Sequence, residues 1–341
     1  MKAIIVESFG PPGVLKMREL PKPEPSAGEV LIQVRASGIC HHDVMHRAGK
    51  LPGAKTGVVI GHETAGDVVG VGAGVSPDLI GTKVVVYQRS FCGHCRDCLR
   101  GRQDLCRSSS QPSVDTDGGN AEFVTVPRGS AIPVPPEMDY TTAALACCPI
   151  ATGVRALMTV AKIEPGDRVL ITGASGGLGA HQLQLVHAFG GTSIAVTTSP
   201  AKVAFLKSLG ADDVVVAEDG SFGANVWMKT GKRGVDIAID NVGNQLAETL
   251  RCVTHGGRAV VLGNILNVEA PVSPGLLIGR RLTVSGSGMG TPEDVRHALA
   301  MMANGQVKPV ISSVMPFDQV SRAHELIEAR AAEGRIVLQG W

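Results

Sequence analysis

The feature that most limits the fold of this chain is a glycine-rich turn at residues 173–179, between the apolar run 168–172 and a helical pattern over 178–189. Glycines let the backbone turn tightly, and the start of a helix offers free N–H groups and a positive dipole end to a phosphate. Ala174 replaces the first glycine of the usual motif, and such a turn can also be purely structural. Its position favours a dinucleotide site on Gly173, Ser175, Gly176, Gly177 and Leu178.

Strand-like and helical segments alternate after this turn. Short apolar runs occur at 192–197, 214–217, 235–240 and 258–262, and a helical pattern with a proline in its first turn covers 200–209. Alternation of this kind is typical of parallel βαβ units. The pattern predicts an α/β fold with a doubly wound parallel sheet.

The remainder of the chain follows a different pattern. Short β-like runs at 29–35, 67–71 and 83–87, separated by glycine- and proline-rich turns, predict a largely β domain before residue 130. Residues 141–163 are expected to be helical, with Thr141 or Thr142 as the cap and with Pro149 kinking or dividing the helix. Two helices, near 293–303 and 318–332, and a strand at 335–338 complete the expected elements.

Composition narrows the classes of function. A chain of 341 residues, 44% of them hydrophobic, suits two domains with a large core. Its net charge of +1 argues against a nucleic-acid partner, because such binding depends on clustered positive charge. The sequence contains no run of about 20 apolar residues, so no membrane span is expected. The N-terminus lacks the pattern of a signal peptide, so a cytoplasmic location is expected.

The end of the second strand of the doubly wound region bears on the choice of nucleotide. An NAD site usually places an acidic residue there to bind the ribose 2′-OH. Here the segment carries Thr197, Thr198 and Ser199, followed by Lys202, and no carboxylate. Hydroxyls with a lysine would attract a 2′-phosphate, so we predict NADP(H) over NAD(H). The alternative is that Lys202 is simply a solvated surface residue.

Four cysteines lie close together at Cys92, Cys95, Cys98 and Cys106. In a reducing compartment this spacing favours a metal over disulfides. Four thiolates complete a tetrahedron around Zn²⁺ and leave no position for a substrate, so the site is expected to be structural. Iron in the same four-thiolate site stays an alternative.

A second group of metal-ligand residues is dispersed along the chain. Cys40 lies in Gly-Ile-Cys-His-His-Asp, His62 and Glu63 lie in Gly-His-Glu-Thr-Ala-Gly, and Cys148 precedes Pro149. Spacing alone does not join them, and each could be an ordinary core residue.

Taken together, these motifs resemble the zinc-dependent alcohol dehydrogenases of the medium-chain dehydrogenase/reductase family, in the same order and essentially from end to end. The resemblance implies that Cys40, His62 and Cys148 hold a catalytic zinc with an open fourth position. It implies that Glu63 lies beside this metal and can bind it, and that Asp43 orients His62. It also implies cofactor contacts from Thr152 and Arg335, and two zinc ions in each chain.

The resemblance further implies an architecture. Residues 1–149 and 287–341 would form a GroES-like β catalytic domain that carries the structural zinc lobe at 88–110. Residues 150–286 would form a Rossmann dinucleotide-binding domain. Relatives pair through the strand near 282–285, so a homodimer or homotetramer with a small-molecule substrate is expected.

The proton-relay positions depart from the family pattern. Alcohol-processing relatives usually carry serine or threonine two residues after the first zinc cysteine and often histidine five residues after it, where this chain has His42 and Met45. His42 could replace the hydroxyl, whereas His41 and His46 are interpreted as surface or ribose-contacting residues. Hydride transfer between nicotinamide and an alcohol, aldehyde or ketone is the first hypothesis. An acryloyl-CoA or enoyl C=C reductase is the second, and a non-enzymatic zinc- and nucleotide-binding sensor is the third.

Overall fold

The computed structural model describes residues 1–341, which divide into two compact units. The first unit contains three stretches of the chain, Met1–Ala151, Met289–Ala303 and Ile311–Trp341. The second unit contains Thr152–Gly288 and Asn304–Val310. The second unit is therefore inserted into the sequence of the first.

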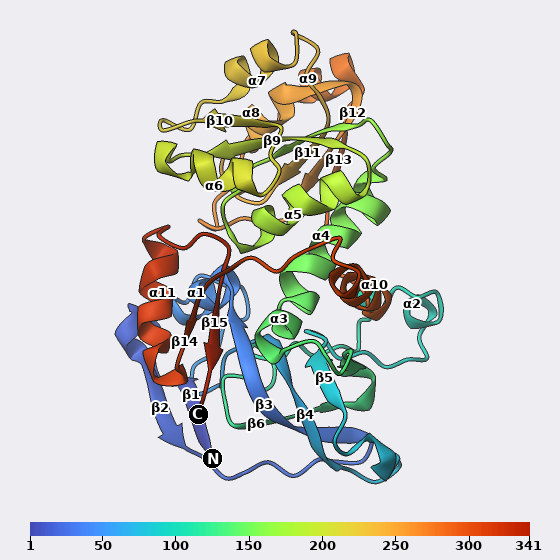
Figure 1. The fold of residues 1–341 in the computed structure, drawn as a ribbon, viewed down its shortest axis with the longest axis vertical. Coiled ribbons are helices and arrows are strands. Elements are labelled where there is room, and N and C mark those ends of the chain that lie inside the picture. Colours follow the sequence, from blue (N-terminus) through green and yellow to red (C-terminus); the bar gives the residue numbers. More distant parts are fainter. The chain divides into compact units, whose positions relative to one another are not determined.

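A seven-stranded sheet forms the framework of the first unit (Figure 1). The strand order is β14-β15-β3-β4-β5-β7, and β6 also pairs with β3. A separate hairpin of β1 and β2 completes the strands. Their bounds are β1 Lys2–Val6, β2 Leu15–Glu19, β3 Glu29–Ile39, β4 Glu63–Val71, β5 Lys83–Val86, β6 Phe123–Pro127, β7 Ala131–Pro133, β14 Ile311–Met315 and β15 Arg335–Gln339.

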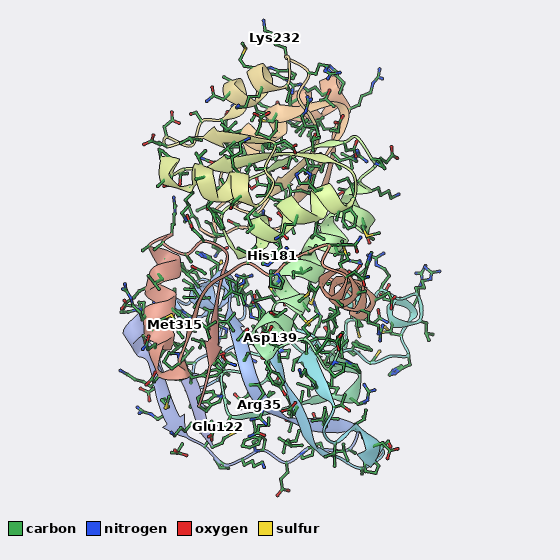
Figure 2. The ribbon with its side chains drawn as sticks, in the orientation of Figure 1. Arg35, Glu122, Asp139, His181, Lys232 and Met315 are labelled. Carbon is green, nitrogen blue, oxygen red and sulfur yellow. The ribbon has the colours of Figure 1, made fainter.

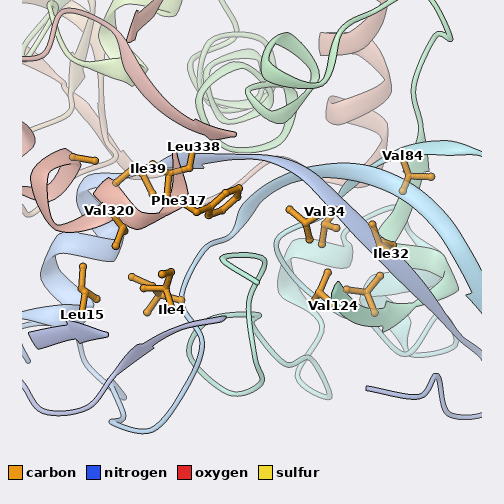
Figure 3. Packing of buried hydrophobic residues seen from close by; sticks show 14 of the residues in the cluster. Ile4, Leu15, Ile32, Val34, Ile39, Val84, Val124, Phe317, Val320 and Leu338 are labelled. Atoms are coloured by element: carbon orange, nitrogen blue, oxygen red, sulfur yellow. The ribbon is translucent and has the colours of Figure 1, made fainter. Parts of the chain in front are cut away.

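The hydrophobic core of this unit lies against the sheet and draws on both ends of the chain (Figure 3). Ile4 and Ile32 come from the N-terminal strands, while Phe317 and Leu338 come from the last thirty residues, and all four are almost fully buried. Burial of a side chain of this size contributes about 2 kcal/mol. The C-terminal segment is thus part of the core of the first unit.

Short helices fill the connections of the first unit. They are α1 His41–Arg47, α2 Arg96–Leu99, α3 Tyr140–Ala144, a π-helix at Ala146–Ala151, α10 Pro292–Ala303 and α11 Val320–Glu328. Asp139, labelled in Figure 2, caps α3 by accepting the Thr142 N–H at 2.8 Å. The expectation that Thr141 or Thr142 would be the cap is therefore wrong, because the Asp139 carboxylate just before the helix takes that place.

The helix expected at 141–163 is divided. Division was one of the two effects predicted for Pro149, the other being a kink. Pro149 lies inside the π-helix, and α4 Thr152–Val154 and a second π-helix at Arg155–Ala161 follow. Proline lacks the N–H of a regular helical bond, so a wider turn accommodates it. This irregular turn carries Cys148.

The second unit is a six-stranded parallel sheet in the order β10-β9-β8-β11-β12-β13. Its strands are β8 Arg168–Ile171, β9 Thr192–Thr197, β10 Asp213–Val216, β11 Val235–Asp240, β12 Val253–Val261 and β13 Thr283–Gly286. The helices are α5 Gly177–Ala188, α6 Val203–Ser208, α7 Gly223–Lys229, α8 Leu246–Cys252 and α9 Pro274–Arg280. Strands β9 and β10 lie on one side of β8, and β11, β12 and β13 lie on the other. This is the doubly wound order.

Both halves of the predicted architecture are observed: a largely β unit and a doubly wound parallel sheet. The predicted limits differ in places. β12 begins at Val253, five residues before the expected start at Arg258, because the glycines at 256 and 257 interrupt the apolar pattern that signals a strand. α11 ends at Glu328, before the expected limit at 332, and Arg330 then takes a left-handed φ of 56°.

No helix of the structure has both the length and the apolar character that a membrane span requires.

Candidate active site

Four side chains from separate segments of the first unit meet in one place. The ligand atoms of Cys40, His62, Glu63 and Cys148 all lie within 4.8 Å of one another. The two thiol sulfurs are 3.9 Å apart. These residues are spread over more than one hundred positions of sequence, so only the fold brings them together.

The elements around the cluster explain its geometry. Cys40 follows β3 and is the residue before α1, whereas His62 and Glu63 lie at the start of the neighbouring strand β4. Gly38 faces Glu63 across this strand pair, and a Cβ atom there would come within 2.2 Å of the Glu63 carboxylate. Glycine at this position is what lets the carboxylate turn toward the two cysteines.

Asp43 holds His62 in place. The Nδ1 atom of His62 lies 3.0 Å from a carboxylate oxygen of Asp43, whose other oxygen accepts the Cys40 N–H at 2.9 Å. Burial disfavours the charged imidazole, but the Asp43 charge and hydrogen bond raise the pKa of His62 well above its usual value. Burial alone would raise the pKa of Asp43, yet His62 brings it below its ordinary value. Because Nδ1 of His62 is taken up by Asp43, its Nε2 atom is the one that faces the ligand atoms of the cluster.

Arg335 supplies positive charge beside Glu63. Its Nη2 atom lies 3.0 Å from Oε1 of Glu63, and both side chains are buried. Burial raises the pKa of Glu63 to about 7, although the nearby guanidinium opposes this. Arg335 was expected to contact the cofactor phosphate, and the structure adds a contact with the cluster that the sequence did not indicate.

The cysteines of this region differ in their environments. The contact with Cys148 lowers the pKa of Cys40, and Arg335 and His62 also favour its thiolate. The same contact, together with burial, raises the pKa of Cys148. Cys147 is fully buried, which raises its pKa, and it belongs to no cluster of ligand atoms. The geometry therefore separates Cys148, in the cluster, from its neighbour Cys147.

His42 lies next to the cluster and contacts a residue that sequence reasoning missed. Its ring stands edge-on to that of His62, with centroids 5.0 Å apart. Burial and the neighbouring His62 lower the pKa of His42 to about 4. Its Nε2 atom lies 3.3 Å from the side-chain nitrogen of Gln111. Gln111 belongs to no motif, so no signal in the sequence singled it out.

The two other histidines of this segment have different surroundings. His46 is fully buried and its Nε2 atom lies 2.8 Å from the carbonyl oxygen of Lys55, so the interpretation of His46 as a surface residue is wrong. The buried side of α1 consists of Asp43, Val44, His46 and Arg47, which places His46 in the interior. His41 is half-buried.

A second cluster contains only thiols. The sulfur atoms of Cys92, Cys95, Cys98 and Cys106 lie within 4.8 Å of one another. Backbone N–H groups of His94 and Cys95 lower the pKa of Cys92 to about 6. Thiolate and backbone N–H groups in this arrangement suit a tetrahedral Zn²⁺. His94 is exposed and lies outside the four-sulfur set, as the tetrahedron requires.

In the second unit, the glycine-rich turn joins β8 to α5 as predicted. Gly173 has a φ of 60°, and a Cβ at Gly179 would come within 2.6 Å of the backbone of Ala174. No side chain caps α5 at Gly176, so its first N–H groups stay available to an anion. Ser175, Gly176 and Leu178 are partly exposed beside this helix start.

The hydroxyl-rich segment follows β9. Thr197 is its last residue, and its side-chain oxygen accepts the Ser199 N–H at 3.2 Å. Thr198 is exposed, and Lys202 closes the 3₁₀ turn Pro200–Lys202 before α6. Thr152, the remaining residue expected to contact the cofactor, is largely buried at the start of α4.

Comparison with known proteins identifies related sequences over the whole length. Residues 26–136 match the alcohol dehydrogenase GroES-like domain, and residues 177–304 match the zinc-binding dehydrogenase domain. An acryloyl-coenzyme A reductase of Metallosphaera sedula is 30% identical over 340 residues, which is 99% of each chain. An alcohol dehydrogenase of Geobacillus stearothermophilus is 32% identical over 343 residues, also 99% of each chain.

Solved structures are also similar to this chain over nearly its whole length. The crystal structure of AibC has a TM-score of 0.92 and 38% sequence identity, covering 99% of this chain and 95% of that one. The alcohol dehydrogenase of the archaeon Aeropyrum pernix also has a TM-score of 0.92, with 25% identity and full coverage of both chains. The chain is therefore an oxidoreductase of the medium-chain dehydrogenase/reductase family, and belongs to its zinc-type alcohol dehydrogenases.

Proposed function

We propose that this enzyme transfers a hydride between NADP(H) and an alcohol, aldehyde or ketone at the cluster of Cys40, His62, Glu63 and Cys148. The single observation that carries the proposal is the convergence of these ligand atoms within 4.8 Å. Two thiols and an imidazole match the Cys₂His set of catalytic zinc sites, which keep one position open for substrate.

In this proposal Cys40, His62 and Cys148 hold the zinc, and Glu63 lies beside it and can bind when the water leaves. The metal, when bound, supplies a Lewis acid to the substrate oxygen. Asp43 fixes the His62 ring through its 3.0 Å contact, so Nε2 stays directed at the cluster. Arg335 balances the negative charge that two thiolates and a carboxylate bring into a buried region. Cys92, Cys95, Cys98 and Cys106 hold a second, structural zinc.

The cofactor would bind to the second unit through Gly173, Ser175, Gly176, Gly177 and Leu178, with Thr152 and Arg335 as further contacts. Thr197, Thr198, Ser199 and Lys202 would receive the 2′-phosphate of NADP(H). This choice is supported by the absence of a carboxylate at the end of β9, where a 2′-OH would need an acceptor.

A second candidate is an acryloyl-CoA or enoyl C=C reductase. Two observations favour it: the acryloyl-coenzyme A reductases among the relatives, and the replacement of the usual relay residues by His42 and Met45. Methionine cannot pass on a proton, which weakens the case for simple alcohol oxidation. Hydride would then go to a C=C bond conjugated to a thioester carbonyl.

One assay separates the two candidates. NADPH oxidation is followed with a panel of aldehydes and ketones and, in parallel, with acryloyl-CoA and other enones, before and after treatment with a zinc chelator. Carbonyl activity that disappears with the catalytic zinc supports the first proposal. Activity on C=C bonds that survives loss of this zinc contradicts it and supports the second. A chain that binds NADPH but reduces neither class would favour a sensor.

We further propose that residues 1–149 and 287–341 act as the catalytic domain and 150–286 as the cofactor domain, and that the chain forms a homodimer or homotetramer. Strand β13 supports the assembly, because it ends the six-stranded sheet and its other edge has no strand beside it. Val284 on β13 and Ile278 on α9 are exposed apolar residues in the same region of the chain. An unpaired apolar edge is a natural place for a second copy to add its strand.

A further inference from the structure

The imidazole of His42 has one hydrogen-bond partner in the protein, the side-chain amide of Gln111. The two nitrogen atoms, Nε2 of each residue, are 3.3 Å apart. An amide nitrogen carries two hydrogens and can only donate. His42 therefore accepts through the lone pair on Nε2, and the hydrogen of the neutral ring stays on Nδ1.

Gln111 is itself firmly held. Its backbone N–H donates to the Asp115 carboxylate at 2.9 Å, and its carbonyl accepts the Asp115 N–H at 2.8 Å. On its other side, the Ser110 N–H donates to the Ser90 hydroxyl at 2.7 Å. The amide is thus presented to His42 from a fixed piece of backbone, and a change of tautomer in the ring would place two donors face to face.

The other ring nitrogen of His42 has no partner within the protein. Nδ1 is buried without a hydrogen bond, although its ring lies beside the His62 ring of the cluster. A buried N–H group without an acceptor is unfavourable by about 1–3 kcal/mol and is uncommon in folded proteins. A substrate oxygen held at the cluster is a group that could accept from it.

We propose that Gln111 is a positioning residue that holds His42 in the Nδ1–H tautomer, so that the site offers a substrate oxygen a hydrogen-bond donor. This inference rests on the proposed function and narrows its substrate class. A serine or threonine hydroxyl can accept one proton while it donates another. In the tautomer fixed by Gln111, Nδ1 already carries its hydrogen and Nε2 faces a donor, so His42 cannot take a proton from an alcohol.

Such a group favours reactions in which the substrate oxygen gains negative charge. A fixed donor stabilises that charge in the transition state without moving a proton. Reduction of a ketone or aldehyde, or of a C=C bond conjugated to a carbonyl, meets this condition. The substrate is therefore bound through an oxygen that is a carbonyl before hydride addition and carries negative charge after it, and the proton that completes reduction comes from a group other than His42.

The test reads the tautomer directly. Protein labelled with ¹⁵N in its histidine rings is examined by NMR at neutral pH without substrate, and the His42 signals are assigned by their loss in His42→Asn. We expect a protonated Nδ1 and an unprotonated Nε2. In Gln111→Glu the new carboxylate accepts, so the hydrogen should move to Nε2. Gln103→Glu makes the same charge change near the thiol cluster and should leave the His42 signals unchanged.

Kinetics provide the second readout. Gln111→Glu should lower kcat for reduction by tenfold or more, with the KM for NADPH changed less than twofold. A hydrogen on Nε2 in the unaltered protein would overturn the inference, as would a Gln111→Glu variant with unchanged His42 signals. The wild-type spectrum decides even if the variant does not fold. An unaltered chain with the expected tautomer but no reductase activity would contradict the proposed function and leave the positioning role intact.

Discussion

The guanidinium of Arg335 lies 3.0 Å from the Glu63 carboxylate, with 8% of one side chain and none of the other exposed. Removing one partner of a buried pair leaves the other charge without compensation. We expect Arg335→Met to lower the free energy of unfolding by about 3 kcal/mol. Urea unfolding measures this change.

The chain offers a matched control for that variant. Arg35 pairs with Asp67 at 2.8 Å in the same unit, but its side chain is 43% exposed. Arg35→Met should therefore change the free energy of unfolding by less than about 1 kcal/mol. If the two variants lost equal free energies of unfolding, burial would not make the Arg335 pair contribute more to stability than the exposed pair.

The position of Cys148 in the cluster makes a prediction about metal content. Cys148→Ala should bind one zinc fewer per chain than the unaltered protein and lose reductase activity, while it still binds NADPH. Cys147→Ala should keep its full zinc content, because that thiol lies outside the cluster. Elemental analysis and NADPH titration check both variants, and the reverse result would move the ligand by one residue.

The proposed 2′-phosphate site predicts a change of cofactor preference. Lys202→Glu places a carboxylate beside the hydroxyls at the end of β9, and should lower the ratio of kcat/KM for NADPH to that for NADH at least tenfold, about 1.4 kcal/mol. Lys207→Glu, on an exposed lysine of the following helix α6, should leave this ratio near its original value. A native preference for NADH would contradict the assignment.

His324 on α11 predicts how stability depends on pH. Burial lowers the pKa of this histidine to about 4, and neither ring nitrogen has a hydrogen-bond partner. The unfolded chain, with a pKa near 6.5, binds the proton first, so stability is complete above that pH and falls as the pH decreases toward 4. Between pH 7 and pH 5 this one group should remove about 2 kcal/mol.

The variant His324→Leu isolates that contribution. Between pH 7 and pH 5, the free energy of unfolding of this variant should decrease by about 2 kcal/mol less than that of the unaltered protein. Urea unfolding at both pH values measures the difference. His255→Leu, which changes an exposed histidine, should retain the original pH dependence. If His324→Leu keeps the full loss at pH 5, other groups cause the acid sensitivity.

The proposed assembly can be tested on strand β13. Val284→Lys places a charge on this edge and should shift the protein from dimer or tetramer to monomer in sedimentation velocity experiments. Val314→Lys is the matched change on β14, which ends the sheet of the first unit and is also exposed. A monomeric wild-type protein, or dissociation by the β14 variant alone, would contradict the proposal.

The sequence indicated the second unit well, because each βα unit carries its own local signal. The alternation of apolar runs and helical patterns after Gly173 identified the strands and the glycine turn at nearly their observed limits. The thiol cluster was equally clear, since Cys92 to Cys106 lie close together in the chain. Local patterns failed where glycines interrupted β12, where Asp139 capped α3 and where α11 ended before its expected limit.

The candidate active site depended on the resemblance to a family. Nothing in the spacing of Cys40, His62 and Cys148 shows that β3, β4 and a π-helix bring them together. Contacts that carry no motif were missed altogether. Gln111 and the ion pair between Arg335 and Glu63 arise from tertiary packing, and a single glutamine or arginine leaves no periodic signal to read.

The place of β15 in its sheet sets an order of events during synthesis. β15 ends almost at the C-terminus, yet it lies between β14 and β3, pairing with the very strand that leads to Cys40. Until residues 335–339 have been synthesised, the part of β3 next to Cys40 lacks one of its neighbouring strands and Glu63 has no Arg335 beside it. The inserted unit, whose strands are all complete by residue 286, has no such dependence. A growing chain can therefore form the parallel sheet of the second unit before it can form the pairing that completes the surroundings of Cys40 and Glu63.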